Sequence, residues 1–195
     1  AHVIARGMLT DWLGRWPAGD WAKAWQLAYR RPDRNIVQRE TKKNLVPESL
    51  VYAVMREESA FEPSAESHAA AYGLMQLIVP TAKILAKPLG LPSDASSLKQ
   101  PTVNIALGTR GLAELEKTFS QNPLLAIPGY NAGPNRPRRW LRERPRVDFD
   151  VWVEMIPITE TRRYTKRVLA SRAAYAYLYE RERSAESMAL PVRME

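Results

Sequence analysis

A helix expected between Pro47 and Phe61 constrains the fold of this chain more than any other sequence feature. Pro47 favours a first helical turn, because the amide hydrogen that proline lacks has no partner there. At about 100° per residue, the apolar side chains gather on one face, with Tyr52 and Arg56 expected on the opposite face. The apolar residues of the expected buried face are Leu50, Val51, Val54, Met55 and Phe61.

Two neighbouring glutamates lie near the end of this expected helix, and their angular positions differ. Glu58 falls near the centre of the apolar face, whereas Glu57 falls on its flank. A carboxylate inside a buried stripe is costly unless it is paired or protonated. Two interpretations follow: Glu58 reaches solvent or pairs with an arginine, or it is a catalytic acid whose pKa is raised by burial.

The rest of the chain predicts further helices and very few strands. Helical patterns cover about residues 33–42 and 159–180, others begin at Pro80 and Pro101, and alternating strand patterns are scarce. Two i, i+4 tryptophan pairs predict two short helices, the second capped by Asp20. They are Trp12 with Trp16 and Trp21 with Trp25. We interpret them as packing residues, with carbohydrate stacking as the alternative.

We therefore predict an all-α protein with three parts. Residues 1–31 form a helical, Trp-rich N-terminal extension docked on the main domain. Residues 32–180 form that domain, and residues 181–195 form a C-terminal tail. The N-terminus has neither an initiator methionine nor a signal-peptide pattern, which predicts a processed chain or a fragment.

Composition excludes several kinds of chemistry. The chain has no cysteine, so disulfides, thiolate metal sites and cysteine nucleophiles are excluded. Its two histidines, His2 and His68, are far apart in the sequence, and no partner pattern for a metal site or a Ser-His-Asp triad accompanies His68. No run approaches 18 apolar residues, the length that indicates a transmembrane helix.

The net charge of +8 calls for an anionic partner, and nucleic acid, a membrane surface and cell-wall polymers all fit. Much of this charge lies in one arginine cluster. We interpret the cluster as a solvated basic loop, because no nucleic-acid motif accompanies it and its prolines oppose a continuous recognition helix. Its members are Arg136, Arg138, Arg139, Arg142, Arg144 and Arg146.

Four short patterns, in this order along the chain, resemble the catalytic domain of the soluble lytic transglycosylase family. They are Glu-Ser-Ala-Phe at 58–61, Gly-Leu-Met-Gln at 73–76, Tyr-Asn-Ala-Gly-Pro at 130–134, and Ile-Pro-x-x-Glu-Thr-Arg-x-Tyr at 156–164. Two weaker ones are Pro-Thr-Ala at 80–82 and Asn-Ile-x-Leu-Gly at 104–108. The resemblance covers about residues 25–179 and implies a lysozyme-like helical fold in an enzyme that cleaves peptidoglycan.

The resemblance assigns the catalytic role to Glu58. It implies cleavage of the β-1,4 bond between N-acetylmuramic acid and N-acetylglucosamine without water, giving 1,6-anhydromuramoyl ends, with Glu58 as acid and then base. One carboxyl group suffices for this reaction, whereas ordinary glycosidases use two. Neither a metal nor an organic cofactor is implied. A hydrolytic muramidase of the goose-type lysozyme kind and a non-catalytic peptidoglycan-binding module remain alternatives.

The same resemblance implies roles for five supporting residues. Ser67 and Gln76 are expected to hydrogen-bond the sugar near the cleavage point. Tyr130 is expected to place its hydroxyl near the catalytic carboxyl or the substrate. Asn131 belongs to the same substrate-binding group and shapes the turn that presents Tyr130, since asparagine tolerates positive φ. Glu160 is expected to contact a peptide or sugar group of the substrate.

One departure from the family pattern affects the expected site. Pro128 and Gly129 replace two small helix-forming residues before Tyr130, and a kink at Pro128 would change how that tyrosine is presented. The implied partner is the peptidoglycan glycan strand, not nucleic acid, in the periplasm or cell envelope of a bacterium. Peripheral association with the envelope, the oligomeric state, and cleavage at strand ends or within strands are left open.

Overall fold

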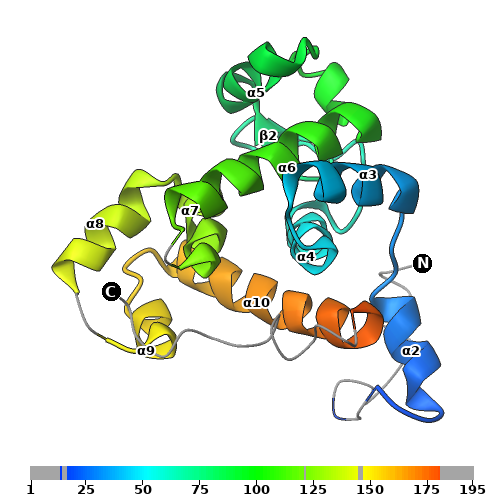
Figure 1. Ribbon diagram of the computed structural model, residues 1–195, viewed down its shortest axis with the longest axis vertical. Helices are drawn as coiled ribbons and strands as arrows, with labels where there is room; N and C mark the ends of the chain where they lie inside the picture. The colour runs from blue at the N-terminus through cyan, green and yellow to red at the C-terminus, as the bar shows by residue number, and fades with distance from the viewer. Residues whose placement is uncertain (1–13, 15–16, 121, 145–146, 181–195) are drawn as a thin grey trace.

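The structure of the protein is a computed structural model that describes residues 14, 17–120, 122–144 and 147–180. Helices dominate the described residues (Figure 1), and the all-α prediction is confirmed. The α-helices are α2 (Trp21–Ala28), α3 (Arg34–Asn44), α4 (Glu48–Ser59), α5 (Val79–Ala86), α6 (Pro101–Thr118), α7 (Ala126–Ala132), α8 (Asn135–Glu143), α9 (Phe149–Glu154) and α10 (Thr159–Tyr179).

Short elements join these helices. The 3-10 turns are η2 (Lys87–Leu89), η3 (Ser97–Lys99) and η4 (Pro123–Leu125). Two-residue strands β1 (Ala71–Tyr72) and β2 (Leu77–Ile78) pair antiparallel, with Ala71 opposite Ile78 and Tyr72 opposite Leu77. This hairpin encloses the Gly-Leu-Met-Gln turn at 73–76, which therefore has a fixed base.

Helix α4 lies at the centre of the fold, where α3 and α10 pack against it and α6 and α7 complete the surrounding layer (Figure 1). All of its residues from Ser49 to Arg56 are buried. The prediction that Tyr52 and Arg56 lie on an open face is therefore wrong, because they are 0% and 4% exposed. Tyr52 donates a hydrogen bond to the carbonyl of Pro32, and the Arg56 guanidinium donates to the carbonyl of Ala28. Residues distant in sequence thus cover the expected polar face.

The predicted helix around the second tryptophan pair is confirmed as α2, whereas Trp12 and Trp16 lie outside the described residues. The capping role expected of Asp20 is wrong, because its side chain makes no capping hydrogen bond and its backbone is already helical. Beyond α2, the Tyr29 ring packs edge-on against Tyr175 at 5.2 Å. This contact attaches the end of α2 to α10, and the proposed boundary at residue 31 stays a prediction.

Prolines lie inside two helices without breaking them. Pro128 is the third residue of α7 and Pro137 the third of α8, so both occupy a first turn, where amides have no intrahelical acceptor. Helix α7 therefore continues through Pro128. A Cβ added at Gly129 would lie 3.1 Å from the Phe119 ring and 3.3 Å from Leu115, so glycine lets α7 approach α6 closely.

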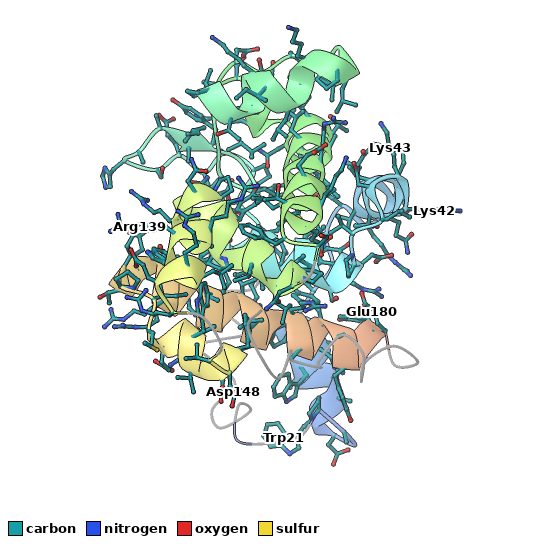
Figure 2. All side chains as sticks on the ribbon, turned by 60° about the vertical axis from the view of Figure 1, so that its left-hand side comes forward. Trp21, Lys42, Lys43, Arg139, Asp148 and Glu180 are labelled. Carbon is teal, nitrogen blue, oxygen red and sulfur yellow. The ribbon has the colours of Figure 1, made fainter. Side chains whose placement is uncertain are left out.

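The arginine cluster is partly helical, so the expectation of a loop there is wrong. Arg136 to Arg142 lie on α8, and Arg139 pairs with Glu143 at 2.6 Å, one turn away. Figure 2 shows Arg139 projecting from one side of the molecule and Lys42 from the other. Positive charge is therefore spread over separate surfaces. In the described part of the chain, no helix is long and apolar enough to cross a membrane.

Candidate active site

Glu58 lies in the last turn of α4, beside two tyrosine hydroxyl groups that come from different helices. Tyr164 comes from α10 and Tyr130 from α7, and burial raises the pKa of both phenols, which the charge of Glu58 raises further. The Tyr164 hydroxyl is close enough to the carboxyl group to lower its pKa by hydrogen bonding. It makes no hydrogen bond of ordinary geometry within the described residues. Such loose contacts are common in catalytic sites without substrate.

Burial raises the pKa of the Glu58 carboxyl to about 7. The residue as a whole is half-buried, but its carboxyl group has lost most of its contact with water. Tyr164 and the positive charge of Arg167 oppose this rise, whereas the negative charges of Glu160 and Glu57 add to it. Near neutral pH the carboxyl group can therefore both hold and release a proton, which suits a group that first donates and then accepts one.

Glu57 has a different set of partners, although its side chain is only 8% exposed. One carboxylate oxygen lies 3.0 Å from Arg167 Nε, and the other accepts a hydrogen bond of 2.8 Å from the Ser171 hydroxyl. No described cation lies within 4 Å of the Glu58 carboxylate. The extent of burial does not distinguish Glu57 from Glu58, because α4 has no open face. The two residues differ in the groups that contact them.

The turn at 73–76 forms the next wall of the site and is held by Asn104 of α6. The Tyr130 hydroxyl donates to the Met75 carbonyl at 2.8 Å, and the Met75 amide donates to Asn104 Oδ1 at 2.7 Å. Asn104 Nδ2 donates to the carbonyls of Tyr72 and Leu98. Asn104 is fully buried. The sequence analysis gave it no role, and the signal was its place in the Asn-Ile-x-Leu-Gly pattern.

Two glycines allow this turn to approach α6. Gly73 has a φ of +77°, and an added Cβ would lie 2.1 Å from the Leu98 carbonyl oxygen. A Cβ at Gly108 would lie 2.3 Å from Met75 Sδ. Real Cβ atoms do not come so close, so larger residues would displace the turn. The short patterns around 73–76 and 104–108 thus encode a single packed unit beneath the site.

Ser67 and Gln76, the predicted sugar ligands, hold the loop that precedes the turn. Gln76 Nε2 donates to the Ala65 carbonyl at 3.2 Å and to the Gly73 carbonyl at 2.9 Å. The Ser67 hydroxyl accepts a hydrogen bond from the Ala71 amide at 3.1 Å. Both side chains are half-buried. Their structural partners are thus defined, and their contact with sugar stays a prediction.

The two remaining predicted residues lie where α7 meets α10. Asn131 Oδ1 accepts a hydrogen bond of 2.7 Å from the Thr161 hydroxyl, which fixes α7 against α10. Glu160 is exposed in the first turn of α10 and close enough to raise the pKa of Glu58. The fold thus brings Glu58, Tyr130 and Glu160 together with Tyr164, the last residue of the pattern at 156–164, for which the sequence leaves open a contact with a carboxylate or with the substrate.

A pocket of about 910 Å³ opens between α3, the start of α4 and the end of α10, and none of the predicted site residues lines it. Both positively and negatively charged residues line this pocket, so it is not a simple apolar ligand pocket. Among the described residues, no group of three or more metal-ligating side chains could hold an ion. The charged residues of the pocket are Arg31, Arg34, Lys42, Glu48, Arg172 and Glu180.

Comparison with known sequences gives consistent matches. Residues 35–153 match the family model described as Transglycosylase SLT domain. The soluble lytic murein transglycosylase of Escherichia coli K12 is 38% identical over 154 residues, which cover 77% of this chain and 23% of that protein. A putative soluble lytic murein transglycosylase of Haemophilus influenzae is 39% identical over 166 residues, covering 83% and 28%. The chain thus spans less than a third of the length of these relatives.

Solved structures agree with this result. The 70 kDa soluble lytic transglycosylase of Escherichia coli superposes with a TM-score of 0.76 at 33% identity, over 89% of this chain and 29% of that one. An inactive mutant of lytic transglycosylase Slt from Pseudomonas aeruginosa gives 0.74 at 34% identity, over 88% and 28%. The predicted lysozyme-like helical fold is therefore confirmed.

Proposed function

This chain belongs to the transglycosylase SLT domain family, and we propose that it cleaves peptidoglycan as a lytic transglycosylase with Glu58 as acid and base. The observation that carries the proposal is a desolvated carboxyl group with a pKa of about 7, flanked by two tyrosines and paired with no cation of the described residues. The proposed setting is the periplasm or cell envelope of a bacterium, with peptidoglycan strands as the partner.

In the proposed first step, protonated Glu58 donates its proton to the oxygen that links N-acetylmuramic acid to N-acetylglucosamine. The C1–O bond breaks, and the N-acetyl carbonyl of the substrate stabilises the positive charge that develops at C1. A raised pKa favours this step, because the carboxyl group still holds its proton near neutral pH. Tyr164, a neutral hydroxyl group beside Glu58, stabilises the resulting carboxylate, whereas the Tyr130 hydroxyl holds the Met75 carbonyl of the adjoining turn.

In the proposed second step, the Glu58 carboxylate removes the proton from the C6 hydroxyl group of the muramoyl residue. The C6 oxygen attacks C1, which closes the 1,6-anhydro ring and returns the proton to Glu58. The nucleophile comes from the substrate, so neither water nor a second carboxylate takes part. The flanking Glu57 is consistent with this scheme, because its carboxylate is already paired with Arg167.

Hydrolysis is the second candidate function, and the position of Glu160 is the observation that favours it. An inverting glycosidase needs a second carboxylate that activates water. Glu160 is exposed and close enough to Glu58 to act on its pKa. In a hydrolase, the Glu160→Gln substitution would abolish turnover, whereas in a transglycosylase it would leave a substantial rate.

Product analysis tests the proposal. Purified sacculi would be digested with the chain and the fragments measured by mass spectrometry, for the unchanged chain and for Glu160→Gln. We expect 1,6-anhydromuramoyl ends from both proteins. Reducing ends that are heavier by one water, about 18 Da, would identify a hydrolase. Binding to sacculi without new ends would identify a non-catalytic module.

A further inference from the structure

Glu57 sits beside the proposed acid in the sequence and in a closed set of polar contacts in the fold. Its carboxylate lies 3.0 Å from Arg167 Nε, accepts a hydrogen bond of 2.8 Å from Ser171, and lies 3.8 Å from Arg56 Nε. Arg167 and Ser171 project from successive turns of α10. The Glu57 side chain is 8% exposed, whereas that of Arg167 is 53% exposed. Glu57 is therefore the fixed member of the pair.

Four side-chain groups act on the pKa of the Glu58 carboxyl group, and they come from two helices. Three belong to α10, and the fourth is Glu57 of α4 itself, while the hydroxyl of the neighbouring Tyr130 is bonded to the Met75 carbonyl. Among these described groups, Arg167 carries the only positive charge. Left unpaired, that charge would draw the proton off the acid. The three groups from α10 are Glu160, Tyr164 and Arg167.

We propose that Glu57 is a positioning residue that holds the Arg167 guanidinium in place and neutralises it, so that Glu58 keeps its proton near neutral pH. This inference rests on the proposed function, because it concerns the protonation of the proposed acid. Glu57 does not touch the substrate in this scheme. Its effect on Glu58 has two parts, its own negative charge and its pairing with Arg167, and the contacts with Ser171 and Arg56 hold the Glu57 carboxylate in place.

A purely structural role for the pair makes a different prediction. If Glu57 and Arg167 only fasten α4 to α10, removing either one loosens the same contact, and the two single variants behave alike. If the charges tune Glu58, the two variants behave oppositely. Glu57→Gln leaves the Arg167 charge uncompensated, which lowers the pKa of Glu58. Arg167→Gln leaves the Glu57 charge uncompensated, which raises it.

The test is the pH dependence of cleavage for the unchanged chain, both single variants and the double variant. The rate falls with rising pH as Glu58 loses its proton. Glu57→Gln should move this fall about one pH unit lower, and Arg167→Gln should move it higher by a similar amount. The double variant should return close to the unchanged profile. Shifts in the same direction, or no shift in folded variants, would overturn the inference.

Ser171→Ala is the matched control, because it removes one contact of Glu57 without changing any charge. Its pH profile should stay close to that of the unchanged chain. A shift equal to that of Glu57→Gln would mean that packing, and not charge, sets the profile, and the inference would then be wrong. Circular dichroism and thermal melting confirm that each variant is folded.

A second measurement separates this inference from the proposed function. Titration of the ¹³C-labelled glutamate carboxyl groups by NMR follows Glu58 without substrate. Opposite shifts of its pKa in the two single variants support the inference even if Glu58 proves to have no catalytic role. If Glu58→Gln abolishes cleavage but the pKa of Glu58 does not move in the two single variants, the inference is refuted. The proposed function is then left intact.

Discussion

Among the residues that the structure describes, two carboxyl groups have a pKa raised to about 7, and they lie in different regions. Burial is the main cause for both Glu58, at the end of α4, and Glu116, on α6. Glu58 lies beside neutral phenol groups, whereas Glu116 faces the charge of Arg172 on α10. Burial lowers the pKa of Arg172, and Glu116 opposes that effect. The second region therefore sets a half-buried carboxyl group within the field of a half-buried guanidinium group.

This comparison teaches that a raised pKa alone does not identify a catalytic acid, because buried ion pairs also perturb titration. What distinguishes Glu58 is the kind of neighbour it has. The Tyr164 hydroxyl lies where it can hydrogen-bond the charged form of Glu58, and the positive charge of Arg167 near Glu58 is already paired with Glu57. Among the described residues, Arg172 is the side chain that acts on the pKa of Glu116, and no hydroxyl group is placed to hydrogen-bond its carboxylate.

The largest expected difference between the two regions is catalytic. Glu58→Gln should lower the rate of peptidoglycan cleavage about 1,000-fold, since general acid–base catalysis contributes roughly 10²- to 10⁴-fold. Glu116→Gln, the matched control, should change the rate less than about threefold, because surface or remote substitutions leave the site intact. Rates of solubilisation of labelled sacculi measure both. Equal losses in the two variants would contradict the distinction drawn here.

The next difference concerns stability against pH. Because folding raises the pKa of Glu58 from 4.5 to about 7, its proton stabilises the folded state below pH 4.5, and this contribution is lost as pH rises through 7. Glu58→Gln should therefore be more stable than the unchanged chain at pH 8 by about 3 kcal/mol, and no more stable at pH 4.

Glu116→Gln should gain less at pH 8, because it also removes a charge that stabilises Arg172. Urea unfolding of the three proteins at the two pH values measures these differences. If Glu116→Gln gained more stability at pH 8 than Glu58→Gln, the environments assigned to the two carboxyl groups would have to be exchanged.

A third prediction concerns the packing beneath Glu58. Asn104→Ala would leave the Met75 amide and the carbonyls of Tyr72 and Leu98 without their buried partner. We expect a loss of about 3 kcal/mol in the free energy of unfolding, with a lower rate of cleavage in the protein that remains folded. Chemical denaturation and single-turnover rates provide the measurements. An unchanged rate would show that the turn does not position the site.

The smallest expected effect comes from the tyrosine beside the acid. Hydrogen bonding from Tyr164 lowers the pKa of Glu58, so Tyr164→Phe should raise it and move the fall in activity to higher pH. Tyr179→Phe is the control, because that hydroxyl donates to the Tyr29 carbonyl in the other region. Its pH profile should match that of the unchanged chain. If the fall in activity of Tyr164→Phe moved to lower pH, the assigned contact between Tyr164 and Glu58 would be contradicted.

Local sequence patterns predicted the helices well and the environment of the site less well. The period of the apolar residues was enough for α4, α6 and α10, because their cores repeat every three to four residues. It could not reveal that Tyr52 and Arg56 are buried, since residues 28–32 and α10 cover them. Contacts between residues far apart in the chain leave no local signal.

Proline positions show how much depends on where a helix begins. Pro128 looked like an interior residue, because the start of α7 was not marked by a strong cap. With the helix beginning at Ala126, the same proline lies in the first turn and costs no hydrogen bond. Tyr130 therefore reaches the Met75 carbonyl from a regular helix. Without a predicted first residue for this helix, the sequence could not show that Pro128 lies in its first turn.

The most direct test of the central claim is the pH profile of cleavage by the Glu116→Gln variant, compared with that of the unchanged chain. If Glu58 is the acid, both profiles fall with the same apparent pKa near 7, about tenfold per pH unit above it, and NMR assigns that pKa to Glu58. A fall that disappears when Glu116 is replaced would contradict the account.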